Sequence, residues 1–192
     1  MTDFRGIKKA SDYKRGELAR DILRLVYAGV LAGTTIAAPN VVQIIDMFDP
    51  QGATERNRIW KAIKYLEEKN RLRIVRQGDN RTLLITSDGK LLINEITIDD
   101  LEIQKPRLWD KKWRIVMFDI PLTHARNRHP FRAKLENMGF VQYQRSVFVH
   151  PYESRKEIGA LAEFYGVRAH VRYLVVEEMD NVRDLALAFG LI

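Results

Sequence analysis

The 192-residue sequence predicts an α+β protein, with an N-terminal winged helix-turn-helix followed by a ferredoxin-like β-α-β-β-α-β domain. Two observations predict this class. The first half of the chain carries three helical patterns and then a hairpin pattern, whereas the second half alternates strand-like and helix-like runs. A basic segment that contains Pro106 separates the halves. We therefore expect a winged helix-turn-helix over residues 1–104, a linker over 105–111, and a ferredoxin-like domain with a C-terminal tail over 112–192.

Three helices are predicted in the first half from the spacing of apolar residues. The first runs from Tyr13 to Val30 and stops within the stretch 34–40. A second, shorter helix follows over 39–48. The third covers 53–69, with Thr54 as its cap and with apolar residues at the spacing of one core-facing stripe.

A hairpin is predicted after the third helix. Two strand-like runs lie within 71–86, and the turn residues Gly78, Asp79 and Asn80 join them. The segment 54–81 holds nine basic and four acidic residues, so it carries +5 of the chain's net charge of +7. Such a charge favours an anionic partner, nucleic acid first.

The basic residues of this segment are candidate DNA contacts. Asn57, Lys61 and Lys64 are predicted on the helix face opposite Ile59 and Ile63, which suits a recognition helix in a major groove. The hairpin tip would reach a phosphate or a minor groove. The alternative is a helix face that is merely solvated by charged side chains. The predicted contacts are five helix residues that would enter the groove and three hairpin residues that would hold the backbone: Arg56, Asn57, Arg58, Lys61, Lys64, Arg76, Asn80 and Arg81.

The second half follows the ferredoxin-like order, in which a four-stranded antiparallel sheet carries both helices on one face. The predicted elements are a strand over 113–119, a helix over 130–138, strands over 140–144 and 147–150, a helix over 154–165 and a strand over 168–177. The first strand is apolar at successive positions, so we expect another subunit or the tail to cover its second face. The tail has an apolar stripe from Val182 to Phe189 and is expected to dock.

Asp119 is the carboxylate near the end of the largely apolar stretch Trp113–Pro121, and its role has two explanations. It could be a metal-binding, catalytic acid, with Mg²⁺ as the cation, although one carboxylate is too few for a tight site unless a dimer supplies its twin. Alternatively, it accepts hydrogen bonds from the loop that follows or pairs with Arg126 or Arg128.

The four histidines indicate no clear metal site. His124 and His129 fall in the loop after Asp119, but a zinc site there would lack a further clustered ligand. His150 and His170 lie on predicted strands, where we expect surface or interface positions.

Composition excludes several classes. The chain has no cysteine, which rules out disulfides and thiolate metal sites and favours a reducing cytoplasm. The N-terminus lacks the apolar stretch of a secretory signal, and the longest uncharged apolar run, Leu25–Ile45, is broken by glycines and a proline, so no membrane span is expected. No glycine-rich phosphate loop follows a strand and no GxSxG motif is present, so hydrolase and kinase functions have no support.

The run WDKKWRIVMFDIP, followed by FRAKLENMGFVQYQRSVFVHPYE, resembles the central domain of the phenylacetate-type (PaaX-like) transcriptional repressors. That domain is in turn similar to the CRISPR-associated adaptation protein two. The resemblance covers about residues 109–178. It rests on the strand end Phe118-Asp119-Ile120-Pro121, on the Gly139-Phe140 step into the second strand, and on the run 146–149 in the third.

The resemblance implies a homodimer through the ferredoxin-like domain, which would present two winged helices to a pseudo-palindromic duplex. In the CRISPR proteins, the acid at the position of Asp119 would bind a metal at the two-fold axis. Repressors of this family usually continue into a C-terminal domain, which is expected to be absent from a chain that stops at Ile192. Sensing of coenzyme A thioesters is therefore not carried over.

The expected function is that of a dimeric, sequence-specific transcriptional regulator, a repressor, whose partner is double-stranded DNA. Two alternatives from other classes stay open. One is a Mg²⁺-dependent nuclease of the CRISPR adaptation type that uses Asp119 of both subunits. The other is a non-catalytic, architectural subunit of a DNA-integrating complex, with an integrase-like partner.

Overall fold

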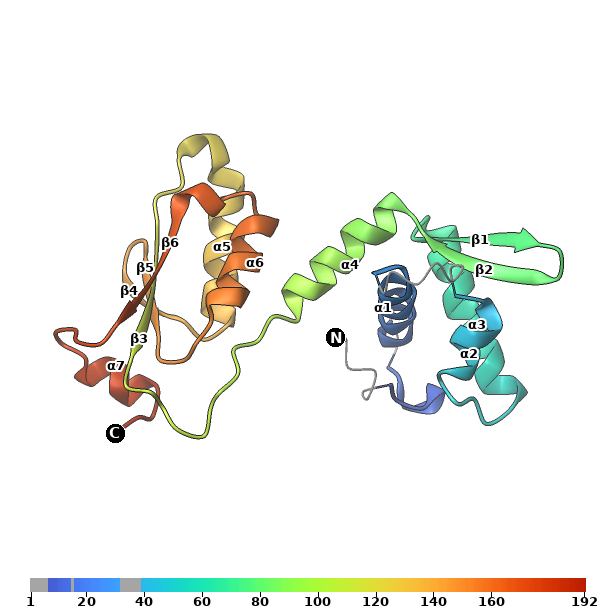
Figure 1. Ribbon diagram of the computed structural model, residues 1–192, viewed down its shortest axis with the longest axis horizontal. Helices are drawn as coiled ribbons and strands as arrows, with labels where there is room; N and C mark the ends of the chain where they lie inside the picture. The colour runs from blue at the N-terminus through green and yellow to red at the C-terminus, as the bar shows by residue number, and fades with distance from the viewer. Residues whose placement is uncertain (1–6, 15, 32–38) are drawn as a thin grey trace. The chain divides into compact units, whose positions relative to one another are not determined.

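The computed structural model describes residues 7–14, 16–31 and 39–192 (Figure 1). The chain forms two compact units, Met1–Ile96 and Thr97–Ile192, and the expected linker 105–111 falls inside the second of them. The described part of the chain is a mixed α+β structure with two sheets. No helix in it has the length and apolar character needed to cross a bilayer.

Helices and one hairpin make up the first unit. Its elements are α1 (Glu17–Leu31), α2 (Val41–Asp46), α3 (Ala53–Glu68), β1 (Leu72–Gln77), β2 (Asn80–Ile85) and the first part of α4 (Ser87–Asp99). The predicted end of the first helix, within 34–40, lies mostly outside the described residues. One core unites these elements, because fully buried Ile22 of α1, Ile63 of α3 and Leu83 of β2 belong to the same apolar cluster.

The hairpin has a two-residue loop. Gln77 pairs with Asn80, and Gly78 between them has a positive φ of 58°, a conformation that glycine adopts without strain. A further bridge joins Asn40 to Thr82 of β2, beside the hydrogen bond from the Leu83 amide to the Pro39 carbonyl at 3.0 Å. The residues just before α2 therefore form a short extended segment that pairs with β2 beside the hairpin.

Two local expectations for this unit need correction. Thr54 does not cap α3. The cap residue is Gly52, and the Glu55 carboxylate accepts a hydrogen bond from the Gln51 amide at 2.9 Å. Helix α4 was not predicted, because Gly89 and the β-branched residues along it weaken the helical signal. Gly89 is required there, since an added Cβ would lie 2.0 Å from the Arg71 carbonyl oxygen.

The second unit contains a four-stranded antiparallel sheet in the order β4-β5-β3-β6. Its elements are β3 (Trp113–Phe118), α5 (Ala125–Asn137), β4 (Val141–Gln144), β5 (Val147–His150), α6 (Arg155–Phe164), β6 (Val171–Val176) and α7 (Arg183–Ala188). The order agrees with the expected ferredoxin-like pattern.

Both faces of the sheet carry apolar residues. Phe118 and Val116 lie on the face that α5 and α6 cover (Figure 1), within one buried cluster. Trp113 points to the other face, where Leu185 of α7 packs in a second, smaller cluster. The tail thus docks on the sheet, as expected. It leaves Met117 42% and Leu174 39% exposed on the same face.

Three predicted boundaries in this unit are wrong. Helix α5 begins at Ala125, after a 3₁₀ turn, so Pro130 lies inside the helix and not at its start. The strand predicted from 168 begins at Val171, because a 3₁₀ turn occupies Arg168–His170. The strand predicted through Asp119 ends at Phe118.

Candidate nucleic-acid interface

Helix α3 presents an exposed polar face opposite its core-facing residues. Ile59 and Ile63 are fully buried, while Asn57 and Lys61 are exposed about half a turn away. Within the described part of the chain, the side chains of Asn57 and Lys61 make no hydrogen bond or ion pair. Both are therefore available to an external ligand, as their predicted role requires.

Arg56 and Arg58 have partners inside the first unit. Arg56 Nη1 lies 3.2 Å from Asp46 Oδ1, which ties α3 to α2. The Arg58 guanidinium donates to the carbonyl oxygens of Ser11, at 3.3 Å, and of Tyr13. These two arginines stabilise the position of α3, a role that charge counting did not identify.

Trp60 lies between two of the predicted contacts. Lys64 Nζ is 5.5 Å and Arg81 Cζ 6.0 Å from the centroid of its ring, so the indole holds one cation of α3 and one of β2 on a common aromatic surface. Sequence reasoning missed this residue. Its position one helical turn before Lys64 was the available signal.

Glu67 fixes Lys64 and the start of the hairpin. Lys64 Nζ donates to one carboxylate oxygen at 2.7 Å, and the Ile74 amide donates to the other at 3.3 Å. The hydrogen bond from Lys64 is the main cause that lowers the pKa of Glu67. Lys64 is thus held in place and only partly free.

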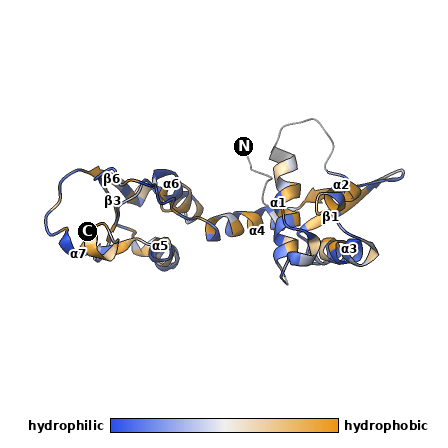
Figure 2. Cartoon of the chain, turned by 90° about the horizontal axis from the view of Figure 1, so that it is seen from below, coloured by the Kyte–Doolittle hydropathy of each residue, from blue (hydrophilic) through white to orange (hydrophobic). Residues whose placement is uncertain are grey.

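The hairpin tip is hydrophilic, as Figure 2 shows in blue. Arg76 and Arg81 are exposed and stand directly opposite each other in the antiparallel register. Like charges at such positions repel, so an anion between them would be stabilising. Asn80 is turned toward α2, because its side-chain oxygen accepts from Asn40 Nδ2 at 3.3 Å.

Asp119 follows the last residue of β3 and lies beside the turn that contains His170. Its amide donates to the His170 carbonyl at 3.0 Å, and its exposed side chain lines a cavity of about 450 Å³ together with Ser146 and Arg172. Among the residues that the structure describes, Asp119 forms no ion pair with Arg126 or Arg128, and no three acidic or histidine side chains are grouped as metal ligands. His170 lines the same cavity as Asp119, and its ring centroid lies 5.6 Å from that of His124, but these side chains form no group of three potential metal ligands in the described part of the chain.

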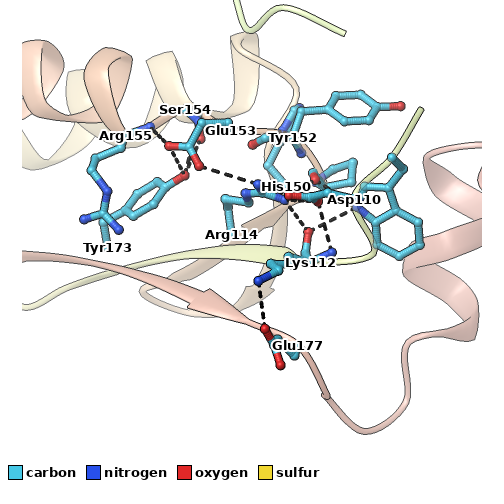
Figure 3. A network of polar contacts seen from close by, with 12 residues as sticks. Asp110, Lys112, Arg114, His150, Tyr152, Glu153, Ser154, Arg155, Tyr173 and Glu177 are labelled. Atoms are coloured by element: carbon cyan, nitrogen blue, oxygen red, sulfur yellow. Dashed lines mark hydrogen bonds and ion pairs between the residues drawn. The ribbon is translucent and has the colours of Figure 1, made fainter. Parts of the chain in front are cut away.

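A polar network holds the segment that leads into β3 (Figure 3). Buried Arg114 makes two hydrogen bonds of 2.6 Å to the Asp110 carboxylate, and its Nη1 also donates to the Pro151 carbonyl at 2.9 Å. The hydrogen bonds from Arg114 are the main cause that lowers the pKa of Asp110. This network ties residues 109–114 to the loop between β5 and α6.

His150 is buried beside this network, so the expectation of a surface or interface position is wrong for it. The rings of Phe140, Tyr152 and Phe189 surround it with centroids 5.0–5.4 Å away. Its Nδ1 accepts from the Tyr152 amide at 3.1 Å. Burial lowers the pKa of His150 to about 4, with a further lowering by the Arg114 charge and an opposing hydrogen bond to Tyr152.

We predict that His150 makes the protein less stable in mild acid. Its pKa is about 4 in the folded chain and 6.5 when unperturbed, so the unfolded state binds more protons between these values. The free energy of unfolding should fall as pH decreases below about 6.5, by about 2 kcal/mol at pH 5 from this group alone. Urea titrations at pH 7.5 and pH 5 measure the difference, and His150→Gln should reduce it. An equal pH dependence in both proteins would contradict the assignment.

Comparison with known proteins gives one family. Residues 106–188 match the PaaX protein central Cas2-like domain. Among solved structures, the crystal structure of AF1382 from Archaeoglobus fulgidus is similar at 21% sequence identity over 43% of this chain and 82% of that chain, with a TM-score of 0.35. No curated protein sequence matched.

Proposed function

We propose, from the PaaX central-domain family to which residues 106–188 belong, that this chain is a dimeric DNA-binding transcriptional regulator that acts as a repressor. One observation carries the proposal. The α3 face that bears the unpartnered Asn57 and Lys61 adjoins, through Trp60 and Arg81, a hairpin whose tip carries two opposed arginines, all within a unit separate from the family domain. A long anion with regularly spaced charges, such as duplex DNA, matches this arrangement.

The first unit is proposed to be a winged helix-turn-helix. The order of three helices followed by a hairpin supports this. The Asn40–Thr82 bridge also supports it, because it adds a third extended segment to the two strands of the hairpin. In this arrangement α3 is the recognition helix and β1–β2 the wing. The proposed domain boundaries remain 1–104 and 112–192.

Roles for the eight predicted residues follow from their contacts. Asn57 and Lys61 are proposed to reach base edges, because nothing in the described structure occupies them. Phosphate groups of the DNA backbone are proposed to be bound by four other residues: Lys64, Arg76, Asn80 and Arg81. Arg56 and Arg58 are proposed to act mainly by positioning α3, since both contact the protein itself.

The second unit is proposed to form the dimer. Its sheet exposes Met117 and Leu174 next to the part that α7 covers, and a two-fold partner would bury them against their own copies. A dimer of this kind reads an inverted repeat, with half-sites about one helical turn apart or a multiple of it.

Selection from a pool of randomised duplexes tests the proposed function. We expect enrichment of an inverted repeat after several rounds with the full chain. A pool that stays random, or enrichment of a single unrepeated site, would contradict a dimeric, sequence-specific regulator.

The nuclease alternative keeps one feature in its favour, the exposed Asp119 carboxylate at a cavity that also contains Arg172. For the proposed regulator, Asp119→Ala leaves duplex affinity within about twofold, because the residue lies outside the first unit. Incubation of labelled duplex with Mg²⁺ and either protein, followed by a denaturing gel, should show intact strands. Cleavage by the wild type that disappears in Asp119→Ala would establish the nuclease instead.

A further inference from the structure

Three arginines line a second cavity of the C-terminal unit, of about 270 Å³. Arg155 begins α6, Arg168 lies in the following 3₁₀ turn, and Arg172 lies on the edge strand β6. Apolar Ile158 and Val171 complete the wall together with the ring of Tyr173. Arginines from three separate elements thus line one hollow, and Arg172 also lines the neighbouring cavity that contains Asp119.

These arginines lack acidic partners. In the described part of the chain none of their guanidinium groups forms an ion pair, whereas Arg114 of the same unit pairs with Asp110. The nearby Glu153 forms its ion pair with Arg114 at 3.5 Å, and it also accepts from the Arg155 amide at 3.1 Å and from the Tyr173 hydroxyl at 3.4 Å. None of the three guanidinium groups is therefore neutralised by a direct ion pair among the described residues.

The surrounding contacts hold two of the guanidinium groups in place. Arg155 Cζ lies 4.6 Å from the centroid of the Tyr173 ring. The Tyr173 hydroxyl in turn accepts from the Ser154 amide at 3.1 Å, which fixes the ring. Arg172 Nη1 donates to the carbonyls of Ala169 and Val171 at 2.8 and 3.0 Å, which leaves its other nitrogens free to donate. Such pre-ordering lowers the entropy cost of binding a ligand.

The start of α6 is an unfavourable place for the cation of Arg155, and the acidic residues of this helix end, Glu153 and Glu157, form no ion pair with it in the described structure. Arg155 is the first residue of α6, where the helix dipole is positive and disfavours a cation. Two further guanidinium groups at the same hollow add repulsion. A local arrangement that costs stability in this way is typical of a functional site.

We propose that this cavity binds a phosphate group. Guanidinium forks match phosphate oxygens in bidentate geometry, and three of them can satisfy the several acceptors of a phosphate dianion. The phosphate could belong to a nucleic-acid backbone or to a small phosphate ester, and both share this chemistry. The site lies in the second unit, so it goes beyond the DNA contacts proposed for α3 and the hairpin.

Titration of inorganic phosphate into the full ¹⁵N-labelled chain, followed through the arginine Nε–Hε resonances, tests the proposal. We expect three resonances to shift along one saturable curve and to disappear in the variant Arg155→Gln, Arg168→Gln, Arg172→Gln. The matched control Arg126→Gln, Arg145→Gln, Arg183→Gln removes the same charge from exposed positions of the same unit and should retain the curve. Non-saturating shifts spread over all arginines would overturn the site.

A salt titration on a labelled duplex distinguishes the two sources of the phosphate. If the cavity contacts the nucleic-acid backbone, the cavity variant lowers the slope of log affinity against log salt by about 2–3, and the control variant does so less. If a small phosphate ester is the ligand, both variants keep the wild-type slope. Failure of the wild type to bind any duplex would count against the proposed regulator, whereas the phosphate titration is judged independently.

Discussion

The double substitution Lys61→Glu and Lys64→Glu is expected to weaken specific duplex binding on the order of 10²–10⁴-fold. The two side chains lie on the exposed face of α3, and reversing both charges replaces attraction to phosphates and base edges by repulsion. The dependence of affinity on salt should also flatten, by a slope of about 2, because fewer counterions are released on binding. Fluorescence anisotropy at several salt concentrations measures both quantities.

The fold should survive this exchange. Lys61 makes no ion pair in the described structure. Lys64→Glu replaces the partly exposed Lys64–Glu67 pair by two carboxylates that repel, which costs about 1 kcal/mol or less. A matched control, Lys90→Glu with Lys105→Glu, makes the same charge change at exposed positions outside α3. If the control weakens binding as much as the test variant does, net charge and not the α3 face governs binding. Unchanged affinity in the test variant would remove α3 from the interface.

A second double substitution, Met117→Glu with Leu174→Glu, is expected to separate the proposed dimer into monomers. Both native side chains are apolar and partly exposed on the sheet face that α7 leaves uncovered. Two carboxylates per chain would face their own copies across a two-fold axis, so the charges repel and apolar burial is lost. The dissociation constant of the dimer should rise on the order of 10²-fold or more. Analytical ultracentrifugation over a range of protein concentrations measures it.

A matched control separates this surface from general apolar exposure. Leu108→Glu with Leu122→Glu places the same charges at positions that are 86% and 88% exposed and lie outside the sheet. The control should stay dimeric. A test variant that remains a dimer would exclude this sheet face as the interface, and a wild type that is monomeric at all concentrations would exclude the dimer itself.

Much of the fold could be predicted because the apolar residues of most helices and strands recur at regular spacing in the sequence. The apolar stripe of α3 is confirmed by the burial of Ile59 and Ile63, and the turn signal at Gly78 marks the hairpin loop. The start of α5 was predicted too late, because Pro130 is typical of a first helical turn and here lies inside the helix. Helix α4 was missed because Gly89 is a poor helix former. Glycine is required at this position because a Cβ atom would collide with the nearby Arg71 carbonyl oxygen.

The candidate site was less predictable than the fold. Charge counting found the basic segment but could not separate the unpartnered Lys61 from Arg58, whose guanidinium is bound to backbone carbonyls far away in the sequence. The hollow between Arg155, Arg168 and Arg172 depends on how a helix, a turn and a strand come together. Convergence of this kind leaves no periodic signal in a single sequence.

The most direct test of the proposed regulator is an anisotropy titration of the wild-type chain. The labelled duplexes are one from the region upstream of its own gene and a scrambled version of the same composition, with Mg²⁺ present and each sample then run on a denaturing gel. We predict tight binding to the upstream duplex, much weaker binding to the scrambled one, and intact strands. Equal weak binding to both duplexes, or cut strands, would contradict the account.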